Sequence, residues 1–339
     1  MRPPSVGPDD DCHQDRSTQY TNSNSALLQN SSQQQSPKLG AWGDDINTIS
    51  DEDVCFIFQN VNGITSSTGL HEALKSKMVA LGGTVTALAE TNVNWQNFNF
   101  CDKWETLLQQ SYASLHFSHS SCDEGKPRKL QRGGTSMVCN YRLGAKLMDK
   151  GCDSLLGRWS WMKFRGRQGT KVLIITAYQV SQTSAQGLGM DTVYMQHWQK
   201  LAKANAAVNP RAQFWADLTM FIQTATAAHT EVLVMMDANA DITDSGFADF
   251  LIACGLHDLH TEDGEVDPPP ETYYRGKRKI DFCLGTNGVA HAVTHAGITS
   301  YEGGLKYSDH WALFVDINEE LLFTSKGVDP TAQKGRDYG

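Results

Sequence analysis

Two near-continuous apolar runs constrain the fold more than any other feature of the sequence. Residues 172–175 read Val-Leu-Ile-Ile, and residues 232–236 read Val-Leu-Val-Met-Met. Short runs of this kind, rich in β-branched side chains, are typical of central strands that are covered on both faces. Segments with helical spacing of apolar residues lie between and beside them, at 192–206 and 211–228. The sequence therefore predicts an α/β domain.

The same patterns predict nine strands and five helices within one domain, residues 51–320. Strands are expected at residues 54–59, 85–89, 113–118, 135–140, 159–165, 172–177, 231–236, 280–285 and 311–317. Helices are expected at residues 69–81, 103–110, 192–206, 211–228 and 247–253. Residues 1–50 are rich in Asp, Ser, Asn, Gln and Pro and are predicted to be a disordered polar tail. Residues 321–339 are predicted to be a shorter flexible tail.

Composition predicts where in the cell the protein is found, but it does not decide which kind of molecule the protein binds. The sequence has no run of about 18 apolar residues and no apolar segment near its start, so we expect neither a membrane span nor a secretory signal. None of the eight cysteines forms a Cys-x-x-Cys pair, which favours reduced thiols in the nucleus or cytoplasm and indicates no zinc motif. The net charge of −9 leaves a nucleic-acid partner open, because local basic segments at 126–132, 163–171 and 275–279 could contact phosphate or be solvated loops.

Polar side chains follow or precede the predicted strands at the points where open α/β sheets build their sites. Asn60 and Asn62 follow the first strand, and Glu90 follows the second. The other strand ends carry Tyr178, Asp237, Asn239, Asp281, Asp309 and His310. Any one of these could be an ordinary turn or a solvated carboxylate. Their repetition at one strand end after another predicts a common site.

The order of these segments resembles that of the endonuclease/exonuclease/phosphatase superfamily, which includes DNase-I-like nucleases, apurinic endonucleases and the endonuclease domains of LINE-type retrotransposons. The matching segments are 59–63, 89–91, 132–135, 177–178, 236–239, 278–281 and 307–310, within residues 54–317. The resemblance implies a four-layer αββα sandwich of two mixed β-sheets with helices on the outer faces. It also implies a metal-dependent phosphodiesterase, in particular a monomeric DNA endonuclease of retroelement or repair type, without a membrane partner.

The resemblance further implies roles for individual residues. Glu90 would hold Mg²⁺ (or Mn²⁺), with Asn60, Asn62 and Asp309 beside it, because hard cations prefer oxygen ligands. Asp237 would position or deprotonate the attacking water, and Asn239 and Tyr178 would hold the phosphate. His310, oriented by Asp281, would stabilise the charge that develops on the phosphoryl group. Substrate contacts are expected from Thr272, Arg275, Arg278 and Ser181.

The sequence departs from the family pattern after Tyr178, where Gln179-Val180-Ser181 replaces the usual Pro-Asn element. The second phosphate contact is therefore missing, or it is made by Ser181 or Gln182. Arg158-Trp159-Ser160-Trp161 could stack bases, although alternating Trp residues favour packing on a half-buried strand. Two alternatives stay open: a phosphatase or phosphodiesterase of the same superfamily that acts on a small-molecule or lipid phosphoester, and an inactive module that binds nucleic acid or protein.

Overall fold

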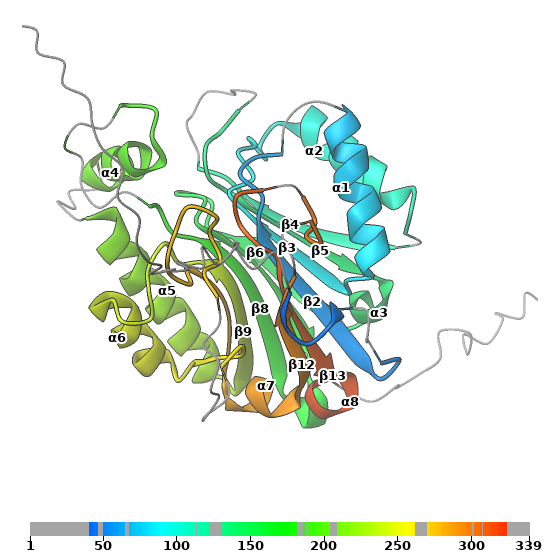
Figure 1. The fold of residues 1–339 in the computed structure, drawn as a ribbon. Helices are drawn as coiled ribbons and strands as arrows, with labels where there is room; N and C mark the ends of the chain where they lie inside the picture. Colours follow the sequence, from blue (N-terminus) through cyan, green and yellow to red (C-terminus); the bar gives the residue numbers. More distant parts are fainter. Residues whose placement is uncertain are drawn as a thin grey trace, which may run out of the picture. The chain divides into compact units, whose positions relative to one another are not determined.

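Two mixed β-sheets form the centre of the computed structural model (Figure 1). The structure describes residues 41–46, 50–64, 68–112, 114–122, 130–181, 186, 189–203, 209–261, 270–299, 302–306 and 308–323. The predicted tails, apart from residues 41–46, 50 and 321–323, lie outside the described residues, as do Gln182, Tyr307 and most of the basic segment 126–132. No helix in the described part of the chain is long and apolar enough to span a membrane.

The seven-stranded sheet has the order β1 (Trp42–Gly43), β12 (Val293–Ile298), β13 (Leu313–Asn318), β2 (Asp53–Asn60), β3 (Val85–Ala89), β5 (Thr135–Asn140) and β4 (Leu115–Ser120). The six-stranded sheet has the order β10 (His257–Asp258), β11 (Asp281–Gly285), β9 (Thr230–Asp237), β8 (Lys171–Tyr178), β7 (Trp159–Arg165) and β6 (Leu147–Cys152). Each sheet contains one parallel pair, β2 with β3 and β8 with β9, and all other described pairs are antiparallel.

The sheets pack face to face, and alternate residues of each central strand enter the core between them. Phe56 and Phe58 of β2 belong to this inner core together with Val172 and Ile174 of β8, while Ile57 and Leu173 face outward. Because the outward residues are also apolar, each sheet needs a second covering layer. The apolar runs that dominate the sequence are therefore the strands at the middle of the sandwich.

Two pairs of helices provide the outer layers (Figure 1). α1 (Thr68–Leu81) and α2 (Phe98–Gln109) cover the seven-stranded sheet with Leu74, Met78, Trp104 and Leu108. α5 (Pro210–Thr226) and α6 (Ser245–Cys254) cover the six-stranded sheet with Phe214, Leu218, Phe247 and Phe250. The predicted four-layer αββα sandwich is confirmed.

The remaining helical segments are short or peripheral. α4 (Val193–Lys203) packs against α5. α3 (Tyr141–Gly144), α7 (Asn287–Ala292) and the 3₁₀ turn η2 (Arg167–Gly169) connect strands, and α8 (Glu319–Leu322) follows β13. Local signals set several helix boundaries: Asn209 caps α5 by accepting a hydrogen bond from the Arg211 amide, and Pro210 occupies its first turn. All nine predicted strands and all five predicted helices are present; β3, β5 and β7 have the predicted bounds, and the other elements have shifted ends.

Arg158 and the two tryptophans beside it lie in a packed layer and not at a surface open to bases. Trp159 is 7% exposed and stacks near Phe221 of α5. The Arg158 guanidinium lies 4.4 Å from the Trp159 ring and donates to Asp153 (2.6 Å) and Asp217 (2.7 Å). The geometry agrees with the packing interpretation of this segment.

Topology brings the predicted site residues to one edge of the sandwich. The carboxyl ends of the parallel strands β2 and β3 carry Asn60 and Glu90, and those of β8 and β9 carry Tyr178 and Asp237. Antiparallel strands begin at the edge where their neighbours end, so β11 starts with Asp281 directly opposite Asp237. His310 precedes β13, whose Leu313 pairs with Phe58 near the end of β2.

Candidate active site

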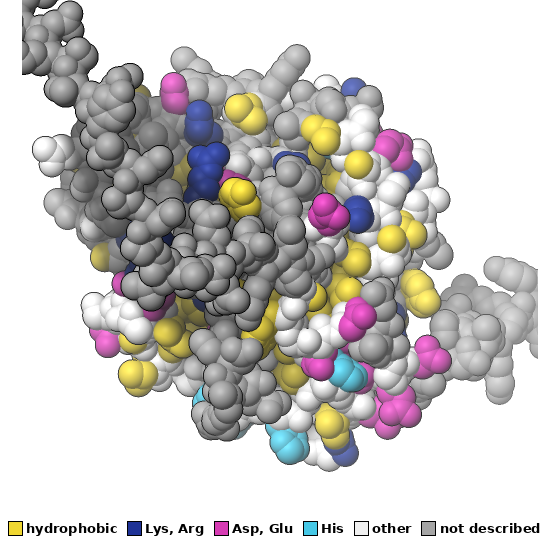
Figure 2. Space-filling view, viewed as in Figure 1, with side chains coloured by type: hydrophobic (Ala, Val, Ile, Leu, Met, Phe, Trp, Pro, Cys, Tyr) yellow, Lys and Arg dark blue, Asp and Glu magenta, His cyan; other side chains and the backbone are white. Residues whose placement is uncertain are grey.

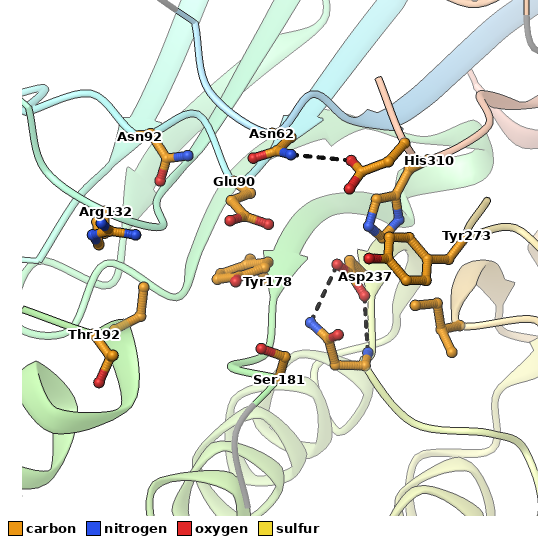
Figure 3. A pocket seen from close by; sticks show the side chains of 14 residues that line it. Asn62, Glu90, Asn92, Arg132, Tyr178, Ser181, Thr192, Asp237, Tyr273 and His310 are labelled. Carbon is orange, nitrogen blue, oxygen red and sulfur yellow. Dashed lines mark hydrogen bonds between the residues drawn. The ribbon is translucent and has the colours of Figure 1, made fainter. Parts of the chain in front are cut away.

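A cavity of about 300 Å³ opens at this edge of the sandwich (Figure 3). Eight of the predicted site residues line it: Asn62, Glu90, Tyr178, Ser181, Asp237, Asn239, Asp309 and His310. Asn60 and Asp281 are fully buried and contact lining residues from behind. The structure thus brings together ten of the side chains that the sequence singled out.

Asn60 connects the two halves of the cavity. Its amide Nδ2 donates to Asp237 Oδ2 (2.7 Å) and to Glu90 Oε2 (3.1 Å), which come from different sheets. Its Oδ1 accepts a hydrogen bond from the backbone N–H of Asn62 (2.9 Å), so the orientation of the amide is fixed by a donor on one side and two acceptors on the other. Asn60 therefore holds two carboxylates in place, and its own oxygen faces the backbone.

His310 and Asp281 form a buried pair. His310 Nδ1 lies 2.8 Å from Asp281 Oδ2, which leaves Nε2 as the ring nitrogen without this partner. Burial by itself lowers the pKa of His310, but the carboxylates of Asp281, Asp237 and Asp309 together outweigh burial and raise that pKa to about 10. The imidazolium form is therefore favoured at neutral pH. A cationic donor facing a cavity is suited to stabilise a developing negative charge.

Thr272 holds this pair from behind. Its hydroxyl oxygen accepts hydrogen bonds from the backbone N–H groups of Ile280 and Asp281, each at 3.0 Å, and its side chain is fully buried. Trp311 N–H donates to the Thr272 carbonyl, next to His310. Thr272 does not line the cavity. In this geometry it positions Asp281 and His310, which differs from the direct substrate contact that the resemblance implies.

Asp237, the last residue of β9 (Figure 3), forms a second unit with Asn239. The Asn239 backbone N–H donates to Asp237 Oδ1 (2.9 Å), and its side-chain amide donates to Asp237 Oδ2 (3.2 Å) and to the Gln179 carbonyl (2.7 Å). Burial, followed by the charge of Asp281, raises the pKa of Asp237 above its usual range. A carboxylate with this tendency to accept a proton is suited to orient or deprotonate a water molecule.

Tyr178 and Glu90 are direct neighbours in the lining of the cavity. Burial raises the pKa of Tyr178 well above its ordinary value, and the neighbouring charges of Glu90 and Asp237 act in the same direction, so the hydroxyl keeps its proton. Burial also raises the pKa of Glu90. A protonated phenol beside two carboxylates can donate a hydrogen bond to an incoming anion.

Oxygen donors suited to a hard divalent cation gather around Glu90. Asp309 and Asn62 lie beside it, joined by a hydrogen bond from Asn62 Nδ2 to Asp309 Oδ1 (3.1 Å). Carboxylate and amide oxygens are the ligands that Mg²⁺ and Mn²⁺ accept. A second group, Asp237, Asp281 and His310, has its ligand-type atoms within 4.8 Å of one another, and Asp281 Oδ1 is buried without a hydrogen-bond partner among the described residues. The site therefore fits a divalent cation.

The backbone around the cavity is strained at several side chains that carry the chemistry. Six non-glycine residues of the described chain have positive φ, and four of them line the cavity: Asn62, Glu90, Asn92 and Asn239. This left-handed conformation is uncommon outside glycine and concentrates at functional sites. Glu90, with φ of +49°, lacks the short side chain that eases this conformation for Asn.

Arg275 and Arg278 do not reach the cavity. Both are exposed, and Arg278 lies 3.8 Å from Asp244. The lining instead includes Arg132, Asn92, Thr192 and Tyr273, for which the sequence assigned no role. Arg132 could have been identified from the sequence, because it is the first residue of the segment 132–135 that matches the family. In that segment Gly134 has φ of +83°, and an added Cβ would lie 2.7 Å from the Ser120 carbonyl oxygen.

No protein-family model and no curated protein matches the sequence. Solved structures do match. An AP endonuclease from Leishmania major has a TM-score of 0.58 at 14% identity over 81% of this chain and 91% of its own. A protein of the endonuclease/exonuclease/phosphatase family from Bacteroides thetaiotaomicron has a TM-score of 0.50 at 12% identity over 80% and 98%. The chain has the endonuclease/exonuclease/phosphatase fold.

A third structure of this fold is a 3′ phosphatase from Neisseria with a product DNA hairpin bound, with a TM-score of 0.53 at 15% identity over 78% of this chain and 99% of its own. Proteins with the endonuclease/exonuclease/phosphatase fold thus include both an endonuclease and a phosphatase. Identities this low establish the fold alone, so the reaction must be inferred from the side chains in the cavity.

Proposed function

We propose that this chain is a divalent-metal-dependent phosphodiesterase that cleaves DNA internally, as a retroelement-type or repair-type endonuclease. One observation carries the proposal: the Asp281–His310 pair and the Asp237–Asn239 unit face Glu90 across a single cavity. This arrangement supplies a base for water, a cationic donor and an anionic cation site around one space. We also propose that the protein acts as a monomer in the nucleus or cytoplasm.

In the proposed reaction Asp237 orients the attacking water and takes its proton, while Asn239 keeps that carboxylate in position. His310, held by Asp281, donates to the phosphate oxygen on which negative charge develops, and Tyr178 donates to the same group. A divalent cation bound at Glu90, with Asp309 and Asn62, would supply Lewis acidity and favour departure of the leaving oxygen. Water attacks the phosphorus directly, so no covalent intermediate is required.

DNA is proposed as the substrate from the similar structures and from the charge at the cavity wall. Two of the similar structures are an AP endonuclease and a phosphatase bound to DNA. Arg132 places a positive charge at the cavity wall, where a second phosphate of a polynucleotide could bind. On the face drawn in Figure 2, the described Lys and Arg side chains form one small group at the upper left, and the others lie singly among acidic and apolar side chains. This pattern favours local phosphate contacts over broad electrostatic attraction.

The second candidate is a phosphatase or phosphodiesterase of a small-molecule or lipid phosphoester. The net charge of −9 and the Gln179-Val180-Ser181 segment favour it. In the structure Ser181 does line the cavity, so it can supply the phosphate contact that the usual Pro-Asn element makes. Comparing hydrolysis of small phosphodiesters with nicking of DNA separates the two candidates.

A third possibility is a binding module without catalytic activity. In that case the catalytic side chains that line the cavity would be present but would take no part in a reaction.

The test uses supercoiled plasmid with Mg²⁺ and compares the wild type with Asp237→Ala and His310→Ala. We expect the wild type to nick the plasmid, and both substitutions and EDTA to abolish nicking. Matched controls are Asp249→Asn and His291→Ala, which alter exposed side chains outside the cavity. If folded wild-type protein does not nick DNA with Mg²⁺ or Mn²⁺, the endonuclease proposal is wrong. Hydrolysis of a small phosphodiester in that case would support the second candidate.

A further inference from the structure

A second cluster of metal-binding side chains lies outside the cavity. Cys101 and Glu105 are one turn apart on α2, and His119 lies on β4 of the sheet that α2 covers. Glu105 Oε1 is 3.3 Å from Cys101 Sγ and 3.3 Å from His119 Nε2, and the ligand atoms of the three residues all lie within 4.8 Å of one another. None of the three lines the candidate active site.

These separations suit a tetrahedral ion. Bond lengths of about 2.0–2.1 Å to nitrogen or oxygen and about 2.3 Å to sulfur place neighbouring ligand atoms of tetrahedral zinc about 3.3–3.6 Å apart. The two measured contacts of Glu105 Oε1 fall at the short end of this range. Three protein ligands leave the fourth position for water, and the Glu105 side chain is 33% exposed, which gives an ion a path from solvent.

The surroundings of His119 hold its ring in the orientation that a ligand needs. Nδ1 lies 2.9 Å from the Ser136 hydroxyl on β5, so Nε2 points toward Cys101 and Glu105. Such a contact on the second ring nitrogen is common for metal-binding histidines and fixes their tautomer. Trp95 stacks on the His119 ring, with centroids 4.0 Å apart and planes 6° apart, and prevents rotation.

We propose that Cys101, Glu105 and His119 form a site for a thiophilic transition metal of the Zn²⁺ class. On binding, the Cys101 thiol gives its proton to water and the sulfur bonds to the ion. The donor set differs from that of the cavity, whose ligands around Glu90 are all oxygens and suit Mg²⁺ or Mn²⁺. The inference does not depend on the proposed nuclease activity.

The site would fasten α2 to the sheet. Trp95, which stacks on His119, also donates from Nε1 to Thr91 Oγ1 (2.9 Å), and Thr91 follows Glu90 in the chain. An ion at Cys101 and Glu105 would therefore stabilise the layer beside the active-site edge. Since metal binding favours the folded state, the ion should raise the melting temperature of the whole domain.

The experiment titrates CoCl₂ into full-length protein from which metals have been removed with EDTA. Cobalt bound to a thiolate gives a charge-transfer absorption band, which an all-oxygen site does not give. We expect this band to saturate with a single equivalent and to disappear when Zn²⁺ is added. Cys101→Ser should remove it, whereas Cys152→Ser, at an exposed cysteine, should keep it. Asp237→Ala should also keep it, which separates this site from the cavity.

Three further variants test the geometry and the charge of the site without large loss of packing. Glu105→Gln and Ser136→Ala should each weaken cobalt binding about 10–100-fold. Lys150→Gln should tighten it, because the Lys150 charge acts on all three side chains and opposes a cation. The proposal is overturned if folded wild-type protein gives no band, or if the band survives Cys101→Ser. The cluster would then be a hydrogen-bonded contact between α2 and β4.

Discussion

Replacing Asp316 with asparagine should make the protein more stable at neutral and alkaline pH. Asp316 lies on β13, opposite Cys55 on β2 and His295 on β12, and its side chain is fully buried. No N–H group of the described residues donates to either carboxylate oxygen, and the Cys55 thiol is a neighbouring weak donor. Burial raises the pKa of Asp316 from 3.8 to about 6, although the Cys55 thiol and His295 act in the opposite direction.

The sign and size of the effect follow from this pKa. Because the folded state holds the proton more tightly than the unfolded state, stability falls as pH rises from about 4 to about 6. At about 1.4 kcal/mol per pKa unit, the ionised carboxylate costs at most about 3 kcal/mol at pH 8 and about half of that at pH 5. Asp316→Asn removes the charge and keeps the shape, so its gain in unfolding free energy should approach these values.

Urea denaturation of the wild type and Asp316→Asn at pH 5 and pH 8 measures the effect. Asp149→Asn, at an exposed position of β6, controls for the change in net charge. The expected result is a stabilisation that grows between the two pH values. A variant that is no more stable than the wild type at pH 8, or equally stabilised at both values, would refute the reasoning.

Three further substitutions test contacts around the site and in the core. Thr272→Val should lower the unfolding free energy by about 2 kcal/mol, because two buried N–H groups lose their acceptor, and should slow catalysis through Asp281. Thr272→Ser should retain both properties in the same denaturation and nicking assays. Arg158→Met should cost about 3 kcal/mol in a urea titration, since it leaves two aspartates without their common partner. Asn60→Ala should lower the melting temperature more in EDTA than in Mg²⁺. Without the Asn60 amide, the Glu90 and Asp237 carboxylates repel each other unless a bound cation lies between them. Equal losses of melting temperature in EDTA and in Mg²⁺ would count against a cation site there.

The fold was predictable where a strand or helix is determined by its own sequence. Central strands such as β8 and β9 are apolar throughout because both faces are covered, and α5 carries its start signal in Asn209-Pro210. The strands without such a signal were missed. β1, β6 and β10 are edge strands and β12 lies next to an edge, and their residues are largely polar or half-exposed because one side of each lacks a covering layer.

Helix ends show the same dependence on local chemistry. α2 begins at Phe98, five residues before the predicted start, because Asn97 accepts a hydrogen bond from the Phe100 amide and caps the helix there. The sequence around it shows several Asn residues and no clear choice among them. The predicted strand at 113–118 lies at Leu115–Ser120, where its register is set by pairing with β5.

The site was predictable to the extent that strand ends determine it. Glu90, Asp237 and His310 were identifiable because each adjoins a recognisable strand. Thr192 and Tyr273 reach the cavity from loops and helix starts, whose paths depend on tertiary contacts that no local pattern encodes. Similarly, Cys101 and His119 are brought together by the packing of α2 on β4, which sequence spacing alone does not reveal.

The left-handed backbone at Glu90 implies a cost in folding stability at the residue that we propose to hold the cation. A glycine at that position would relieve the strain and remove a partly buried carboxylate, so the Glu90→Gly protein should fold at least as well as the wild type while losing the proposed activity. Selection in the laboratory for solubility or heat resistance would therefore tend to remove Glu90 and with it the proposed cation site. In a library of variants, a high yield of folded protein would therefore not indicate function. The residues of the cavity would be kept only if variants were selected directly for phosphodiester cleavage.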